Sequence, residues 1–346
     1  MLDDLKQIHE RDTGDALGVA EKQWQQYQHD YKFRWTPPRP VNQIVVTGMG
    51  GSGLAAKVVC SWPQPPVSYE VVQTYELPDY INQFSLLISS SYSGNTEETV
   101  SALEQALALP EDIRPMIIVL ASGGKVLEIA REHQLTVVQL PGGLQPRWTL
   151  GYQFRALLEI LEQTGRLSGM VGQLADATTW LQEHIAAWVP TVPTAKNPAK
   201  QLAQECMGRS PVIYAGPKLF PAAYKWKINF NENAKHVAWY GRYPEFNHNE
   251  FLGWSGGPPE KPYAVIDLRS NLEHERVQKR FVLSDKLLSG KRPAAHVVDV
   301  QGDTLIKQLM WAIAFGDFVS MYFALLNQQD PSNIDLLEKF KKVMVE

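Results

Sequence analysis

The chain has 346 residues, a length that suits about two domains. Its composition is that of an ordinary globular protein, with 44% hydrophobic residues, 20% charged residues and a net charge of −4. These values exclude a disordered chain and a collagen-like repeat, and they argue against nucleic acid as a partner. The N-terminus lacks the features of a signal peptide, and the most apolar stretch, residues 309–326, contains Asp317. We therefore expect a cytoplasmic protein with no membrane partner.

The first half of the chain alternates between strand-like and helix-like segments. A mixed helix is predicted over residues 5–31, and three prolines within residues 37–40 follow it. Short β-branched runs predict strands at residues 43–47, 67–73, 85–91, 116–121 and 136–140. Helical stretches are predicted at residues 53–61, 97–109, 125–133 and 150–163. Strands that alternate with helices indicate βαβ crossovers and a mainly parallel sheet.

The second half repeats this alternation after a less regular bridge. Strands are predicted at residues 211–216, 263–269 and 295–300, and helices near 219–233, 273–288, 303–326 and 333–344. The two halves look like two copies of one α/β design. We therefore expect an N-terminal helical segment, a first α/β domain, a helical linker and a second α/β domain with a C-terminal helix, at residues 1–40, 41–165, 166–200 and 201–346.

A glycine-rich turn follows the first predicted strand, with the sequence GMGGSG at residues 48–53. It fits the dinucleotide fingerprint G-x-G-x-x-G, in which glycines and a helix N-terminus let the backbone approach an anion. In that fingerprint an acidic residue ends the second strand, whereas Glu70 lies inside the predicted second strand. An anion site is therefore favoured, with a nicotinamide-dependent enzyme or a plain tight turn as alternatives.

A second turn, SYSGNT at residues 91–96, follows the third predicted strand. Ser91, Ser93 and Thr96 supply three hydroxyl groups around a glycine at a helix start. Hydroxyl groups and helix-end N–H groups can hold a phosphate without Lys or Arg. Thr96 as a simple helix N-cap would explain only one of the three.

These two turns resemble the phosphate loops of sugar isomerase (SIS) domains, and the chain resembles the bifunctional phosphoglucose/phosphomannose isomerases. The resemblance implies an α/β fold of two SIS-type, flavodoxin-like domains, each a mainly parallel sheet sandwiched by helices. It also implies that the substrate phosphate is bound by Gly51, Ser52, Ser91, Ser93 and Thr96.

Three more segments extend the resemblance, namely PGGLQPR at residues 141–147, NFNENAK at 229–235 and PEFNHNE at 244–250. In the family they imply that Arg147 stabilises an enediolate, Glu232 is the isomerisation base and His248 assists ring opening. A metal site built from Glu245, His248 and Glu250 is disfavoured, because one histidine and two carboxylates at this spacing match no common metal motif.

The C-terminal segment DPSNIDLLEKFK, residues 330–341, places Lys341 at the lysine position that the family uses with the histidine. The segment departs from the family pattern at Ser332, Asn333 and Phe340. Use of mannose 6-phosphate requires space beside C2 of the substrate, which we expect near Ser332 or Ile334. Because the sequence does not assign this role to one of the two, it supports the use of glucose 6-phosphate more strongly than the use of mannose 6-phosphate.

The resemblance thus implies reversible isomerisation of glucose 6-phosphate and mannose 6-phosphate with fructose 6-phosphate by proton transfer, without a metal or other cofactor. It also implies a homodimer in which His248 comes from the neighbouring subunit. A phosphosugar-binding SIS module without catalytic activity, and an SIS isomerase of another sugar phosphate, remain as alternatives.

Overall fold

The computed structural model describes residues 1–257 and 260–345, which form two compact units. The five-stranded unit comprises Gln23–Thr179, and the four-stranded unit comprises Met1–Lys22 with Trp180–Glu346. The chain passes between the units twice, first after Lys22 and again within α7 (Met170–Ile185). The first 22 residues therefore belong to the same unit as the second half of the chain.

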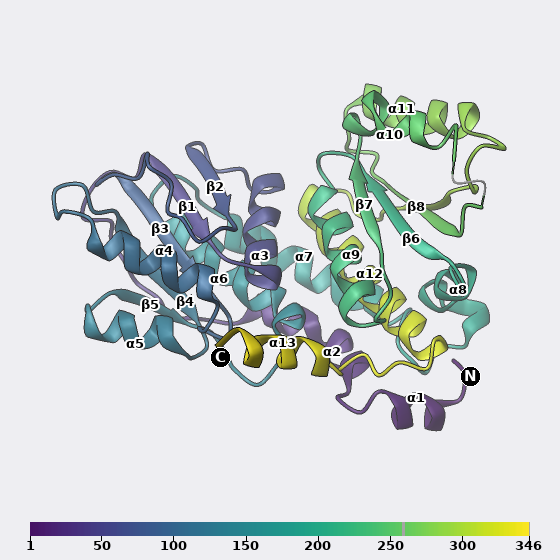
Figure 1. Cartoon of the computed structure of the whole chain (residues 1–346), viewed down its shortest axis with the longest axis horizontal. Coiled ribbons are helices and arrows are strands. Elements are labelled where there is room, and N and C mark those ends of the chain that lie inside the picture. The colour runs from purple at the N-terminus through teal and green to yellow at the C-terminus, as the bar shows by residue number, and fades with distance from the viewer. Residues whose placement is uncertain (258–259, 346) are drawn as a thin grey trace. The chain divides into compact units, whose positions relative to one another are not determined.

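The five-stranded unit has a fully parallel sheet in the order β2-β1-β3-β4-β5 (Figure 1). Its strands are β1 (Gln43–Thr47), β2 (Ser68–Val72), β3 (Ser85–Ser90), β4 (Met116–Ala121) and β5 (Thr136–Gln139). β3 and β4 are buried along their whole length, as expected for apolar runs between two helical layers. The order is that of flavodoxin-like folds, so the predicted fold class is confirmed for this unit.

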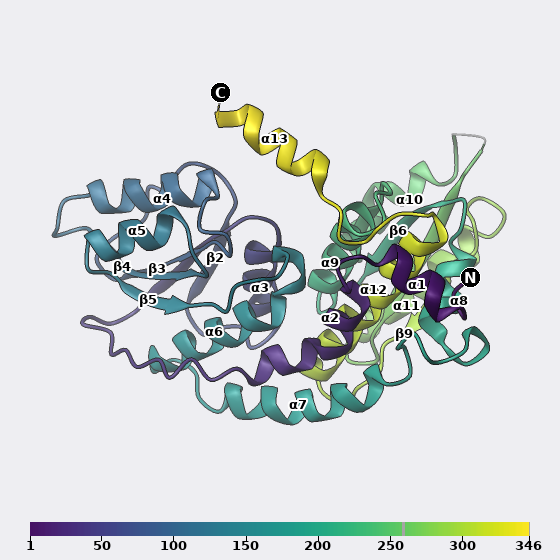
Figure 2. The same ribbon diagram turned by 90° about the horizontal axis from the view of Figure 1, so that it is seen from below.

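Helices cover both faces of this sheet. They are α3 (Gly50–Ser61), α4 (Glu97–Ala108), α5 (Lys125–Glu132) and α6 (Leu150–Gln163). Figure 2 shows α4 and α5 on one face and α6 on the other. α3 packs on α6, and α4 packs on α5. The core between the sheet and α5 includes Val45, Leu87, Val119 and Val126.

The four-stranded unit repeats the same strand order without the fifth strand. Its parallel sheet runs β7-β6-β8-β9, with β6 (Ser210–Ala215), β7 (Trp239–Arg242), β8 (Tyr263–Arg269) and β9 (His296–Asp299). The order matches β2-β1-β3-β4, which confirms that both halves share one α/β design. The helices of this sheet are α8 (Pro198–Glu205), α9 (Phe220–Glu232), α11 (Glu275–Leu287) and α12 (Leu305–Leu326).

α12 is the central helix of the four-stranded unit. Its length and apolar composition would suit a membrane span, but 94% of its most apolar window is buried in the protein. It packs on both α8 and α9. α12 is therefore a core helix.

One predicted helix is broken in the structure, and two elements were not predicted. Residues 5–31 form α1 (Leu5–Arg11), α2 (Ala16–Lys22) and the 3₁₀ segment η1 (Gln23–Gln28) instead of one helix. The break lies at Asp12, whose carboxylate accepts the N–H groups of Ala16 and Leu17 and so starts α2. The helical linker expected at residues 166–200 contains α7, η3 (Thr194–Lys196) and the start of α8. The predictions omitted β7 and α10 (Glu250–Gly253).

Candidate active site

The carboxyl ends of β1 and β3 form the candidate anion site of the five-stranded unit. β1 pairs with β2 on one side and with β3 on the other, which makes this point the topological switch of the sheet. Open parallel sheets bind ligands outside the carboxyl ends of strands at such a point. α3 and α4 begin here, and neither has a side-chain hydrogen bond that caps its first N–H groups. The two helix N-termini therefore favour an anion.

Three of the predicted phosphate-binding hydroxyl groups are held at this point by hydrogen bonds. The Ser91 Oγ lies 2.9 Å from the Thr96 Oγ1 and accepts the Gly94 N–H at 3.1 Å. The Ser52 Oγ accepts the Tyr92 N–H at 3.1 Å, which joins the turn after β1 to the turn after β3. Both serines are buried. The structure thus brings Ser52, Ser91 and Thr96 together.

The remaining groups of this turn are more exposed. Ser93 is exposed, and its Oγ accepts the Asn95 N–H at 3.4 Å. Thr96 stands at the N-cap position of α4, but its hydroxyl pairs with Ser91 instead of a helix N–H group. Glu70, the acid considered for a dinucleotide, lies in the middle of β2 and accepts the Tyr80 hydroxyl.

Tyr92 connects the turn after β3 to two other loops. Its hydroxyl donates to the Pro141 carbonyl at 2.9 Å and accepts the Leu144 N–H at 3.2 Å. Its carbonyl accepts the Ser122 N–H at 3.0 Å and the Ser122 Oγ at 2.6 Å. Burial raises the pKa of the Tyr92 hydroxyl, so it remains a donor at neutral pH. Sequence reasoning missed this role, although Tyr92 lies inside the SYSGNT motif.

Arg147 is placed beside the glycine-rich turn. A Cβ atom on Gly51 would lie 2.6 Å from the Pro146 carbonyl oxygen and 3.5 Å from the Arg147 Cα, so only glycine allows this approach. Arg147 is 2% exposed, which rules out a solvated surface arginine, and its guanidinium carbon lies 4.6 Å from the centre of the Trp148 ring. The segment η2 (Pro146–Trp148) therefore brings a buried cation to the edge where α3 begins.

In the four-stranded unit, Glu232 is the last residue of α9, and the asparagines around it stabilise the backbone. The Asn229 amide donates to Asp317 at 2.6 Å, and the Asn233 amide donates to the Ser320 Oγ at 3.0 Å. The Asn231 side-chain Oδ1 accepts the Ala238 N–H at 3.0 Å. Glu232 itself is half-buried. The asparagines of the motif thus order the end of the helix that carries its carboxylate.

His248 ends the short 3₁₀ segment η4 (Glu245–His248), and its neighbours anchor this segment. The Asn247 amide donates to the Ser284 Oγ at 2.9 Å, and the Asn249 amide donates to Glu245 at 2.6 Å. Glu250 accepts the Tyr214 hydroxyl, which in turn accepts the Trp254 indole N–H at 2.9 Å. His248 is exposed on this anchored segment, which suits an acid–base group.

Tyr214 is a second residue that sequence reasoning missed. It lies on β6 and is fully buried, whereas the segment that it holds is a surface turn. Burial first, and the Glu250 carboxylate second, raise the pKa of the Tyr214 hydroxyl well above its usual range. The hydroxyl is therefore a permanent donor to Glu250, although nothing in the strand sequence pairs these two residues.

Lys341 lies on α13 (Asp335–Val345) and pairs with Glu338 on the same helix at 2.6 Å. The side chains of residues 335–344 are exposed, among them the apolar Leu336 and Phe340. The chain just before α13 is anchored, because Asp330 accepts the Thr13 hydroxyl at 2.5 Å and the Ser332 N–H at 2.8 Å. Glu232, His248 and Lys341 thus lie on three different elements of one unit.

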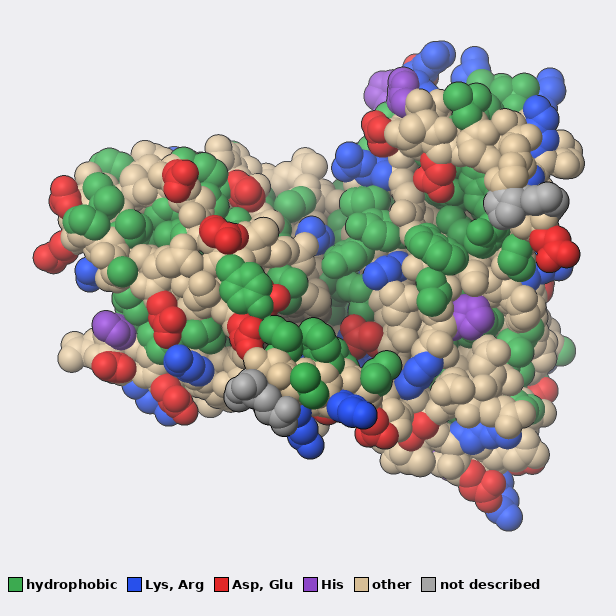
Figure 3. All heavy atoms as spheres, viewed as in Figure 1, with side chains coloured by type: hydrophobic (Ala, Val, Ile, Leu, Met, Phe, Trp, Pro, Cys, Tyr) green, Lys and Arg blue, Asp and Glu red, His purple; other side chains and the backbone are tan. Residues whose placement is uncertain are grey.

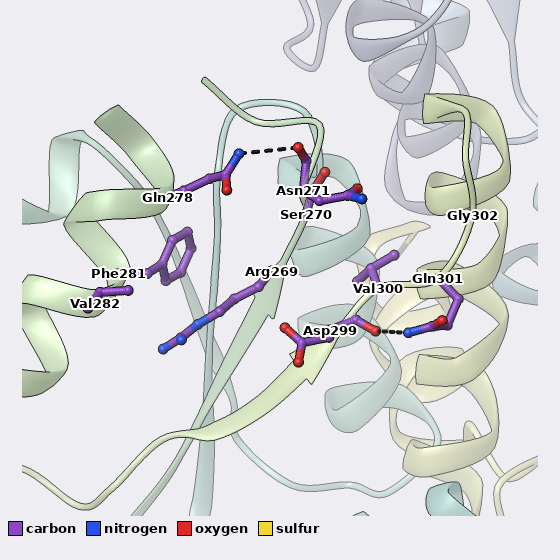
Figure 4. A pocket seen from close by; sticks show the side chains of 10 residues that line it. All are labelled: Arg269, Ser270, Asn271, Gln278, Phe281, Val282, Asp299, Val300, Gln301 and Gly302. Carbon is purple, nitrogen blue, oxygen red and sulfur yellow. Dashed lines mark hydrogen bonds between the residues drawn. The ribbon is translucent and has the colours of Figure 1, made fainter. Parts of the chain in front are cut away.

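A separate hollow of about 400 Å³ lies at the carboxyl ends of β8 and β9 (Figure 4). It is lined by the loop after each strand and by α11, including Arg269, Asn271, Gln278 and Asp299. None of the predicted site residues lines this hollow. In the five-stranded unit the corresponding loops are in contact, since Gly94 lies against Gly123.

Comparisons with known proteins show which family the chain resembles. Residues 195–344 match the family model of the bacterial phospho-glucose isomerase C-terminal SIS domain. The chain is 30% identical over 315 residues to the bifunctional phosphoglucose/phosphomannose isomerase of Caldicellulosiruptor bescii, across 88% of this chain and 90% of that protein. The protein of the same name from Aquifex aeolicus is 30% identical over 306 residues, with the same coverage. The D-glucosamine-6-phosphate 4-epimerase of Sulfolobus acidocaldarius is 33% identical over 236 residues, across 66% of this chain and 70% of that protein.

Solved structures support the fold. The chain is similar to a glucose-6-phosphate isomerase like protein from Thermus thermophilus, with a TM-score of 0.63, 20% identity and coverage of 97% of this chain and 99% of that one. It is also similar to the tagatose-6-phosphate ketose/aldose isomerase of Escherichia coli, with a TM-score of 0.64, 15% identity and coverage of 94% and 91%. The curated relatives at 30% identity show that the chain belongs to the bifunctional phosphoglucose/phosphomannose isomerase family, a family of phosphosugar isomerases.

Proposed function

We propose that the protein interconverts glucose 6-phosphate and mannose 6-phosphate with fructose 6-phosphate through a cis-enediol(ate). The observation that carries this proposal is the group of Ser52, Ser91 and Thr96 hydroxyls at two helix N-termini, next to the buried Arg147. Such a group suits a phosphate monoester, because helix N–H groups and hydroxyls donate to its oxygens. Gly51 and Ser93 complete the proposed phosphate-binding set.

In the proposed mechanism, Glu232 moves a proton between C2 and C1 of the open-chain sugar. The Arg147 guanidinium stabilises the negative charge that develops on the enediolate. His248 and Lys341 assist the opening of the sugar ring by proton transfer. Binding of the remote phosphate supplies the energy that orients the reacting carbons. The reaction oxidises one carbon of the sugar and reduces its neighbour, so the redox change balances within the substrate.

The test is incubation of the metal-stripped protein with fructose 6-phosphate in D₂O. Glucose 6-phosphate and mannose 6-phosphate are measured separately, and deuterium at C2 of each product reports proton exchange with solvent. We expect both aldoses with deuterium at C2, and loss of turnover in Glu232→Gln. Glu205→Gln is the matched control, because Glu205 is an exposed carboxylate of the same unit that pairs with His296. Turnover that persists in Glu232→Gln would contradict the proposed enediol route, whereas products without deuterium would show only that Glu232 returns the proton that it removed.

The D-glucosamine-6-phosphate 4-epimerase relative, which is 33% identical over 236 residues, supports a second candidate activity, the epimerisation of glucosamine 6-phosphate. Glucosamine 6-phosphate is therefore included as a substrate in the same assay. Turnover of glucosamine 6-phosphate without turnover of fructose 6-phosphate would replace the proposed activity. Binding of phosphosugars without any turnover would favour a regulatory SIS module.

We also propose that the active form is a homodimer with His248 supplied by the neighbouring subunit. β7 is an edge strand that exposes Trp239 and Tyr240, and hydrophobic side chains gather over β7 and α9 in Figure 3. β7 leads directly into the segment that carries His248. Mixing Glu232→Gln with His248→Ala chains should restore part of the activity, because a mixed dimer contains one intact site. Activity that stays absent in verified mixed dimers would contradict the shared site.

A further inference from the structure

A column of buried polar side chains joins α9 to α12. Lys225 and Asn229 of α9 are 1% and 0% exposed, and Asp317 of α12 is 7% exposed. The Lys225 Nζ and the Asn229 Nδ2 each donate to the Asp317 Oδ1 at 2.6 Å. The column continues with the Asn233 amide, which donates to the Ser320 Oγ at 3.0 Å, and the Ser320 hydroxyl donates to the Asp317 carbonyl at 2.8 Å.

This column leads to Glu232. Lys225, Asn229 and Asn233 are spaced four residues apart, and Glu232, seven residues after Lys225, lies on the same side of α9. With a rise of about 1.5 Å per residue, Asn229 lies about 4.5 Å and Lys225 about 10 Å from Glu232 along the helix axis. The proposed base is therefore at the end of the column.

The rest of this interface is apolar and tightly packed. Trp226 packs against Phe315, and Phe230 packs against Phe323. A buried ion pair in such surroundings gains little over apolar side chains of similar size, because its desolvation cost offsets most of the attraction. Stability alone therefore does not account for the column. Its directional hydrogen bonds do account for one property: they fix the orientation of α9 about its own axis.

We propose that Lys225 and Asp317 are positioning residues for Glu232. Their hydrogen bonds fix the last turns of α9. Because the positive charge of Lys225 and the negative charge of Asp317 cancel, the pair adds little to the electrostatic potential at Glu232. This inference rests on the proposed function, in which Glu232 is the base. It concerns residues that lie outside the sequence motifs.

Other charged or titratable side chains lie on the elements around Glu232. On α9 and the turn after it, and on α12, β6 and β7, these are Tyr224, Lys227, Lys235, His236, Lys307, Tyr322, Tyr214, Tyr240 and Arg242. Within the described parts of α9 and α12, the charged side chains that are buried are Lys225 and Asp317. Removing one of them therefore leaves the other uncompensated.

The test is the pH profile of kcat/KM for Lys225→Met, Asp317→Asn and the double variant. In Asp317→Asn the uncompensated lysine favours the ionised carboxylate of Glu232, so the acid limb should move to lower pH. In Lys225→Met the remaining aspartate should move it to higher pH. At about 10 Å in a protein interior, each shift is roughly one pH unit or less. The double variant should return the limb to the wild-type position, while kcat stays about tenfold or more below wild type with little change in KM.

Two controls separate positioning from general damage. Lys200→Met removes another buried ammonium group, which donates to the Pro190 and Val192 carbonyls at 2.8 Å each, and it should leave the acid limb in place. Ser320→Ala removes a neutral member of the column and should lower kcat severalfold without moving the limb. If a charge variant does not fold, an unchanged kcat in Ser320→Ala overturns the inference.

In one outcome, the wild-type enzyme proves active and dependent on Glu232, while the acid limbs of Lys225→Met and Asp317→Asn stay in place or move in the same direction. That result would overturn this inference and leave the proposed function intact. Absence of turnover in the wild-type protein would overturn the proposed function, and this inference with it.

Discussion

The substitution Gly94→Ala tests whether close contact between two loops builds the phosphate turn. Gly94 has φ of +76°, which an alanine adopts at a cost of about 1–2 kcal/mol. An alanine Cβ would also lie 1.7 Å from the Gly123 carbonyl oxygen and 2.9 Å from the Gly124 Cα. These are backbone atoms, so no side-chain rotation relieves the collision, and the overpacking adds about 1–3 kcal/mol.

The two effects together predict a loss of about 2–5 kcal/mol in the free energy of unfolding. For a unit of this size, the midpoint of thermal unfolding should fall by about 5–15 °C. The carbonyl of Gly94 also accepts the Val126 N–H at 3.0 Å, so the start of α5 moves with the turn. We therefore expect KM for the phosphosugar to rise in addition.

Circular dichroism during heating measures this loss, and Gly123→Ala is the matched control. Gly123 lies in the same contact, but a Cβ there meets no atom within 4 Å. Gly123→Ala should melt within about 2 °C of wild type, because surface changes without new contacts are nearly neutral. If Gly94→Ala also melts within about 2 °C of wild type, the two loops are not in rigid contact and the reasoning is wrong.

Two further predictions concern the four-stranded unit. Burial, only partly offset by Arg292, raises the pKa of Asp267 from 3.8 to about 6. Between about pH 4 and 6 the folded protein therefore holds this proton, whereas the unfolded chain releases it. The free energy of unfolding should fall as pH rises through that range, by up to about 3 kcal/mol. Urea unfolding at several pH values should show that Asp267→Asn removes this fall, and an unchanged slope would contradict the assignment. Tyr214→Phe removes the bonds to Glu250 and Trp254 and should lower the free energy of unfolding by about 1–3 kcal/mol. It should also lower kcat through His248, and unchanged kinetics would show that the segment does not depend on this anchor.

Strongly apolar elements could be predicted from the sequence with little error. The strands at residues 43–47, 116–121 and 263–269 and the helix at residues 150–163 have the predicted bounds in the structure. Buried parallel strands consist of continuous apolar runs, so their sequences mark both ends. β7 was missed because its residues WYGR are mostly exposed and show no alternation.

The sequence by itself determined the α/β class, the two-fold repetition and the turns that bear glycine and hydroxyl groups, because these follow from local composition and spacing. Its resemblance to a known family also identified Glu232, Arg147 and His248 as candidate catalytic residues. Only the tertiary structure decided that Arg147 is buried beside Gly51, and that Tyr92 and Tyr214 connect distant loops. It also decided that residues 1–22 belong with the second half of the chain. These features depend on contacts between residues far apart in sequence, and no local pattern records which distant side chain will satisfy a buried donor or acceptor.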